Sequence, residues 1–157
     1  MRTHKDFLLE AVELSKKSLT ESEGGPFGCV VVKDGEIIGR GYNRVIDQND
    51  PTAHAEVNAI RQACAHLNNF QLEDCIIYAS SEPCPMCFGA IYWARPKALY
   101  YANTRQQAAE IGFDDQFIYD EIDRKGDDRS ILTYHIPLDE AKNVFREWFA
   151  KIDRVQY

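Results

Sequence analysis

Basic residues are scarce in this sequence relative to acidic ones. Its 157 residues include 18 Lys and Arg against 25 Asp and Glu, and the stretch 110–123 is particularly acidic. A protein that holds a polynucleotide usually presents a basic face, because phosphate contacts supply most of the affinity. The charge balance therefore argues against nucleic acid as a partner and favours a small, uncharged ligand.

Long apolar runs, repeats and a paired set of cysteines are also missing. No stretch approaches the ~18 apolar residues of a membrane-spanning helix, and we find no repeat, low-complexity tract or linker. Five cysteines, an odd number, without an apolar leader are typical of a reducing compartment and not of a disulfide framework. We therefore expect one cytoplasmic domain over residues 1–157, with no membrane partner.

The segment NDPTAHAEV (49–57) places a histidine and a glutamate on either side of Ala55. Asp50 suits a helix N-cap and Pro51 a first helical position, so we expect a helix to begin there. Two residues at this spacing point roughly 200° apart on a helix. His54 and Glu56 can therefore contact a common group only if that group lies over the end of the helix. A lone histidine in such a place is usually a capping or packing residue. An apolar stripe follows at helical spacing: Val57, Ile60, Cys64 and Leu67.

A second helix start carries two cysteines in the segment PCPMC (83–87), which follows an apolar strand pattern. Cys84 and Cys87, three residues apart, lie on one face, and the helix dipole favours thiolate there. Together with His54 they offer three good zinc ligands. A redox pair or two buried cysteines would leave the His-Ala-Glu unit unexplained, whereas a structural zinc site would need a fourth protein ligand.

The two motifs H-x-E and P-C-x-x-C, in this order, resemble the signature of the zinc-dependent nucleobase deaminases. This resemblance implies one zinc held by His54, Cys84 and Cys87, with the fourth position left for water. Two thiolates quench much of the charge of the ion, so a nearby base must help to activate that water. Glu56 is then expected to carry a proton from the water to the substrate and on to the departing amine.

Strand and helix patterns alternate along the chain. Strands are expected at 27–33 and 36–44, joined by the turn Asp34-Gly35, and further strands at 75–80, 98–102 and 132–136. Helices are expected around 7–19, after Asp50, after Cys84 and from about Leu138. The alternation predicts an α/β fold, a three-layer α/β/α sandwich with a central mixed sheet and the metal between two helix starts. The resemblance to the nucleobase deaminases implies that this fold is cytidine deaminase-like.

Nearly the whole chain resembles bacterial guanine deaminases of the cytidine deaminase superfamily. The resemblance is carried by GGPFGCVVVKDGEIIGRGYN, NDPTAHAEV, SSEPCPMCFGAIYWARPKALYYA, GFDDQFIY and the terminal tyrosine. The segment 125–154 matches least, and Ser81 stands where close relatives are expected to have cysteine. The resemblance implies a substrate pocket formed by Phe27, Asn43, Ala55, Trp93, Asp114 or Asp115, and Tyr157.

Each pocket residue also has an ordinary structural interpretation. Phe27 and Trp93 could be core aromatics instead of walls around a purine, and Asn43 could be a turn residue. Asp115, with Asp114 as the alternative, is expected near the leaving amine as a catalytic carboxylate. An acceptor-only carboxylate suits the N1–H and 2-amino donors of guanine and repels N1 of adenine. Ammeline, an aminated triazine, has a similar donor pattern.

The resemblance further implies a homodimer in which the C-terminal segment, about 138–157, crosses to the partner and Tyr157 helps to close its pocket. A loose tail is the alternative to this crossing segment.

Three functions remain for the chain, in this order: guanine deaminase producing xanthine and ammonia, tRNA adenosine deaminase of the same fold, and a zinc-stabilised module without catalysis.

Overall fold

A computed structural model describes residues 2–157, and these divide into two compact units, the second of which is Gln116–Tyr157. The first unit contains the sheet and most of the helices. Its elements are α1 (His4–Glu21), β1 (Gly28–Lys33), β2 (Glu36–Tyr42), α2 (Val45–Gln48), α3 (Ala55–Leu67), β3 (Cys75–Ser81), α4 (Pro85–Ala94), β4 (Ala98–Asn103) and α5 (Arg105–Glu110). The second unit contains α6 (Gln116–Asp123), a 3-10 turn (Gly126–Asp128) and α7 (Asp139–Ala150).

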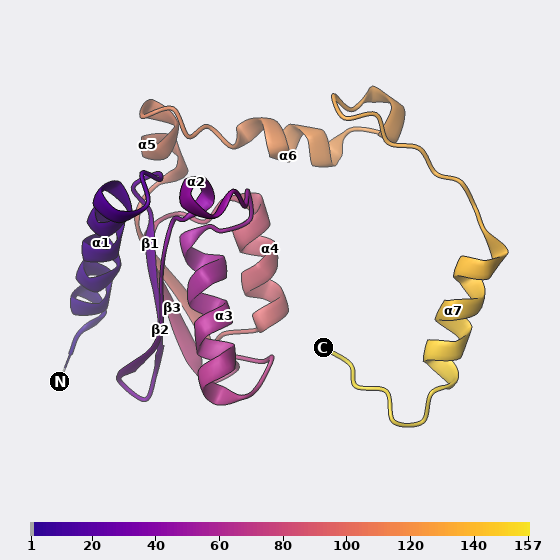
Figure 1. Cartoon of the computed structure of the whole chain (residues 1–157), viewed down its shortest axis with the longest axis horizontal. Coiled ribbons are helices and arrows are strands. Elements are labelled where there is room, and N and C mark those ends of the chain that lie inside the picture. Colours follow the sequence, from indigo (N-terminus) through magenta and orange to yellow (C-terminus); the bar gives the residue numbers. More distant parts are fainter. Residues whose placement is uncertain (1) are drawn as a thin grey trace. The chain divides into compact units, whose positions relative to one another are not determined.

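The four strands form one mixed sheet in the order β2-β1-β3-β4. β1 pairs antiparallel with both β2 and β3, whereas β3 and β4 are parallel. Because successive side chains of a strand face opposite sides, β1 contributes to two cores. Cys29 and Val31 pack with α3 and α4, while Val30 and Val32 pack with Phe7 of α1. Figure 1 shows α1 on one side of the sheet and α3 and α4 on the other, which confirms the three-layer α/β fold.

The first hairpin forms as its sequence predicts. Asp34 and Gly35 connect β1 to β2, and both have positive φ, 51° and 83°. This is the pattern of the two-residue turns that match the twist of a hairpin. Strands β1 to β4 are confirmed, with ends that differ from the expected ones by one or two residues.

The expected start of the third helix is wrong. α3 begins at Ala55, with His54 as its N-cap, and not near Asp50. Asp50 instead accepts hydrogen bonds from the main-chain nitrogen and the hydroxyl of Thr52, at 2.8 and 2.7 Å. This local turn uses the carboxylate that a helix N-cap would have needed.

The expected strand at 132–136 is also wrong, since these residues form neither strand nor helix. A strand needs a partner, and no other strand occurs among the described residues of the second unit. The last helix, expected from about Leu138, is confirmed as α7. No helix within residues 2–157 is long and apolar enough to cross a membrane.

Candidate active site

Two helix starts are built in the same way and carry the residues of the site. His54 is the N-cap of α3 and Cys84 the N-cap of α4, and both have extended backbone. Neither side chain caps its own helix, so the imidazole and the thiol remain available to another partner. Pro85 occupies the first turn of α4, where its missing N–H costs nothing. Cys87 lies in the same turn and is fully buried.

His54, Cys84 and Cys87 converge, with one ligand atom from each lying within 4.8 Å of the others. Both cysteine sulfurs are 3.5 Å from Nδ1 of His54. Tetrahedral zinc, at ~2.3 Å from sulfur and ~2.0 Å from nitrogen, would place these donor atoms roughly 3.5 Å apart. The three side chains therefore fit a zinc ion without rearrangement, through Nδ1 of the histidine.

The electrostatics of the two thiols differ. A hydrogen bond from the Cys87 thiol and the neighbouring His54 lower the pKa of Cys84 to about 4. The same hydrogen bond and burial raise the pKa of Cys87, and the hydrogen bond to Cys84 raises that of His54. Metal ligation requires both thiols to be deprotonated and the imidazole to be neutral, so metal binding must release protons here.

Glu56 is a buried carboxyl beside this group. It lies in the first turn of α3 and is 8% exposed. Burial raises its pKa, against the opposing effect of a hydrogen bond with Cys87. A carboxyl whose pKa is raised and which lies beside the candidate ligands is suited to accept and return a proton.

Asn43 combines a structural role in a turn with a side-chain donor that is available to a ligand. Its Oδ1 accepts a hydrogen bond from the main-chain nitrogen of Val45 at 3.1 Å, which is the turn role. Its carbonyl accepts hydrogen bonds from the hydroxyls of Ser18 and Ser22, at 3.0 and 2.6 Å. Within residues 2–157, no hydrogen bond from its Nδ2 is found. Its amide can therefore donate to an acceptor on a ligand while its backbone stays in place.

The carboxylates of the segment Gly112–Asp115 are distinguished by burial. Asp115 is partly buried and Asp114 exposed. Desolvation, and after it the nearby charge of Cys84, raise the pKa of Asp115. Of the two carboxylates, Asp115 is thus the one that lies within electrostatic reach of Cys84, a candidate zinc ligand.

The remaining expected pocket residues are placed unevenly. Phe27 packs against the core on the side of α3 and α4, and Ala55 is fully buried. Trp93 on α4 is 63% exposed, and Tyr157 belongs to the second unit and is also exposed. The first unit therefore brings His54, Glu56 and both cysteines together, with Asp115 in electrostatic reach, while Trp93 remains open to solvent.

Two residues that support the site escaped the sequence analysis. A Cβ added to Gly41 would lie 2.1 Å from the carbonyl oxygen of Ala55, so this glycine lets β2 lie directly against the first turn of α3. The ring of Phe113 lies edge to face against that of Phe27, with the ring centroids 4.9 Å apart. An isolated glycine in a strand pattern indicates such a close approach; nothing in the local sequence marks Phe113.

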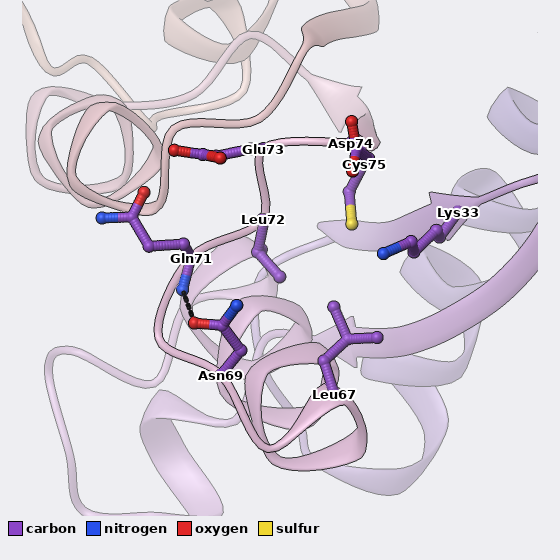
Figure 2. Close-up of a pocket in the computed structure, with 8 residues that line it drawn as sticks. All are labelled: Lys33, Leu67, Asn69, Gln71, Leu72, Glu73, Asp74 and Cys75. Atoms are coloured by element: carbon purple, nitrogen blue, oxygen red, sulfur yellow. Dashed lines mark hydrogen bonds between the residues drawn. The ribbon is translucent and has the colours of Figure 1, made fainter.

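A cavity of about 150 Å³ lies elsewhere in the first unit. It is lined by Lys33 at the end of β1, Cys75 at the start of β3 and the segment after α3 (Figure 2). The cavity lies at the start of β3 and the end of α3, whereas Cys84 follows the end of β3 and His54 precedes the start of α3. The cavity is therefore separate from the candidate zinc group.

Comparisons with known proteins agree with this geometry. Residues 1–103 match the family model described as the cytidine and deoxycytidylate deaminase zinc-binding region. The guanine deaminase of Bacillus subtilis (strain 168) is 53% identical over 154 residues, covering 98% of this chain and 99% of the relative. The crystal structure of the Bacillus subtilis guanine deaminase superimposes with a TM-score of 0.96 at 52% identity, covering 99% of each chain.

Two more distant matches bear on the ligand. The tRNA-specific adenosine deaminase of Aquifex aeolicus is 33% identical over 147 residues, covering 93% of each chain. A solved protein in complex with 8-azaguanine superimposes with a TM-score of 0.69 at 33% identity, covering 72% of this chain and 65% of the other.

Proposed function

Because the chain belongs to the family of cytidine and deoxycytidylate deaminases with a zinc-binding region, we propose that it deaminates free guanine hydrolytically to xanthine and ammonia. One observation carries the chemistry: His54, Cys84 and Cys87 converge beside the buried carboxyl of Glu56. The guanine substrate is supported by the near full-length similarity to a guanine deaminase.

Nδ1 of His54 and the thiolates of Cys84 and Cys87 would hold one zinc ion per chain. When bound, zinc acts as a Lewis acid that makes a water molecule a better nucleophile at neutral pH. Glu56 would take one proton from the attacking water and deliver it to the ring nitrogen next to the reacting carbon, then take the second proton from the newly added hydroxyl and pass it to the departing amine. One water is consumed and one ammonia is released, and Glu56 returns to its starting state.

Asp115, Asn43 and Phe27 orient the base. Asp115 accepts hydrogen bonds from the adjacent N1–H and 2-amino group, while Asn43 donates from Nδ2 to an acceptor on the purine edge. Phe27 forms a wall against the ring. Adenine has an acceptor at N1, which would face the Asp115 carboxylate and leave both groups unpaired, so guanine is preferred. The similarity to a protein solved with 8-azaguanine supports a purine-like base in this site.

The decisive experiment measures ammonia release from guanine, adenine, guanosine, ammeline and tRNA under identical conditions. Guanine should be turned over most efficiently, with adenine and guanosine poor substrates. Robust inosine formation in tRNA without guanine turnover would establish the alternative, an adenosine deaminase acting on tRNA. Zinc binding without turnover of any of these compounds would indicate a structural module.

The active form is a homodimer in which the C-terminal segment of one protomer closes the site of the other. The apolar face of α7 supports this proposal, because Val144, Phe145 and Phe149 are each more than half exposed and offer a packing surface to a second protomer. Tyr157 would cover the bound base. The free state of all five cysteines supports a cytoplasmic location, and deamination of guanine to xanthine would be a step of purine breakdown.

A further inference from the structure

Phe113 has an exposure and a contact that core packing does not explain. The residue is 45% exposed, yet its ring lies edge to face against Phe27, with the centroids 4.9 Å apart and the planes at 89°. Aromatic pairs prefer this arrangement and gain from it beyond the area that they bury. The contact joins the segment after α5 to the loop before β1.

Gly25 shows how closely the two rings approach the main chain. A Cβ at this position would lie 2.8 Å from Cζ of Phe113 and 2.9 Å from Cε2 of Phe27. Real Cβ atoms do not approach other atoms so closely, so the pair can form only over a residue without a side chain. The aromatic pair is therefore built into the loop and is not a chance surface contact.

The Phe27 side of the contact is fixed by hydrogen bonds. The Ser18 hydroxyl donates to the Gly25 carbonyl at 2.7 Å, and the main-chain nitrogen of Phe27 donates to the same carbonyl at 2.8 Å. The main-chain nitrogen of Asn43 donates to the Phe27 carbonyl at 3.1 Å. Phe27 and Asn43, both proposed to orient the base, are thus joined by a main-chain hydrogen bond at the open end of the β1–β2 hairpin.

The Phe113 side is tied to the metal-binding loop. The main-chain nitrogen of Phe113 donates to the Ala108 carbonyl at 3.0 Å, at the end of α5. At the start of α5, the main-chain nitrogen of Arg105 donates to Oε2 of Glu82 at 3.0 Å. Glu82 lies two residues before Cys84. Asp115 follows Phe113 by two residues, so its position depends on how this segment is held.

We infer that Phe113 is a positioning residue: its ring braces Phe27 and thereby holds the wall of the base site and the Asp115 carboxylate at a fixed separation. This inference rests on the proposed function, because it assigns Phe113 to the orientation of the base that Phe27 and Asp115 contact. Phe113 acts through these two residues and takes no part in proton transfer.

The test compares Phe113→Ala and Phe113→Leu with Ile111→Ala. Ile111 lies on the same segment and is exposed, without a ring contact to Phe27, so its variant controls for the loss of apolar surface. Loss of the aromatic pair should raise KM for the preferred base roughly two- to tenfold with a smaller change in kcat, as the value of such pairs implies. Phe113→Tyr keeps the ring and should restore KM. Zinc content and Tm are measured for every variant.

Three further measurements keep the inference falsifiable. Gly25→Ala should raise KM as Phe113→Ala does, because its Cβ separates the rings. The effects of Phe27→Leu and Phe113→Leu should be less than additive when combined. Binding of 8-azaguanine, measured by calorimetry, should weaken in parallel with KM, so the inference is tested even if guanine is not the substrate.

The outcomes separate the inference from the proposed function. If Phe113→Ala matches Ile111→Ala in KM and in 8-azaguanine affinity, or if it lowers only Tm or zinc content, the inference is overturned. A wild-type protein that turns over another base of the panel, with the same dependence on Phe113, would refute guanine as substrate while supporting the positioning role.

Discussion

Glu56 combines burial with a position beside the zinc ligands, and each property has a consequence for the reaction. Glu56→Gln preserves the size and shape of the side chain but removes its ability to carry a proton. Turnover should fall by ~10² to 10⁴, the usual contribution of one general acid or base. Zinc content and Tm should stay close to those of the wild type. Rates within a few fold of wild type would show that another group moves the proton.

His54, Cys84 and Cys87 lie close together, whereas the three remaining cysteines, Cys29, Cys64 and Cys75, are not part of this group. Replacing any one of them by alanine leaves two protein ligands, so the purified variant should retain far less than one zinc per chain in metal analysis. Cys29→Ala and Cys64→Ala are the controls, because both cysteines lie in apolar surroundings on the sheet and α3. Full zinc retention in all three ligand variants would refute the assignment.

Asp115 and Asp114 are neighbours with different surroundings, which makes them a matched pair. Asp115→Asn introduces an amide that can rotate to present either a donor or an acceptor, so discrimination between guanine and adenine should weaken. The ratio of kcat/KM for the two bases measures this directly. Asp114→Asn, on the exposed neighbour, should leave the ratio unchanged. The opposite result would assign the contact to Asp114.

Among the elements, α3 lies directly against the sheet at Gly41 of β2. Gly41→Ala would place a Cβ 2.1 Å from the Ala55 carbonyl oxygen and 2.5 Å from the Ala59 nitrogen, both main-chain atoms that cannot move alone. We expect a loss of about 1–3 kcal/mol in the free energy of unfolding, typical of overpacking, together with weaker zinc binding as the helix start shifts. Chemical denaturation measures the first effect and zinc titration the second.

Gly89→Ala provides the control for this substitution. Gly89 lies within α4, and a Cβ there would meet no atom within 4 Å. Alanine should therefore stabilise the helix by about 0.5–1 kcal/mol. Equal destabilisation by both substitutions would show that contact with the Ala55 carbonyl is not the cause.

Elements could be predicted from the sequence where local chemistry determines them. The turn Asp34-Gly35, the position of β1 and the start of α4 after Cys84 all depend on neighbours within a few residues. The start of α3 could not be located from the sequence, because Asp50 and Pro51 satisfy the rules for a helix start. In the structure the Asp50 carboxylate instead forms a turn with Thr52, and the helix begins later, at Ala55. The pairing of Phe113 with Phe27 joins residues far apart in the sequence, so no local pattern could indicate it.

At the scale of the whole molecule, the second unit has apolar side chains without a core. Ile152 is fully exposed and Phe145, Phe149 and Ile136 are each about three-quarters exposed. Residues 132–136, the segment where a strand was expected, belong to neither a strand nor a helix. A second copy of the chain would supply a packing surface for these side chains, as in the homodimer proposed above.

Deletion of Arg154–Tyr157 tests this arrangement, since it removes the terminal tyrosine and leaves α7 intact. The truncated protein should remain folded, zinc-loaded and dimeric, because the apolar face of α7 is preserved. Guanine turnover should fall sharply, since an open site admits bulk water and holds the base less firmly. Tyr157→Phe, which keeps the ring, should retain more activity than Tyr157→Ala.

The control for the truncation is the oligomeric state, measured by sedimentation on the same samples. Mixing two inactive variants, Glu56→Gln and the truncated chain, discriminates further. If Tyr157 closes the partner's site, a mixed dimer contains one site with an intact Glu56 covered by an intact Tyr157 from the other chain, and activity returns. If Tyr157 serves its own protomer, no site in the mixture has both residues and activity stays low. Unchanged kinetics in the truncated protein would instead show that the last four residues are a tail without a role in catalysis.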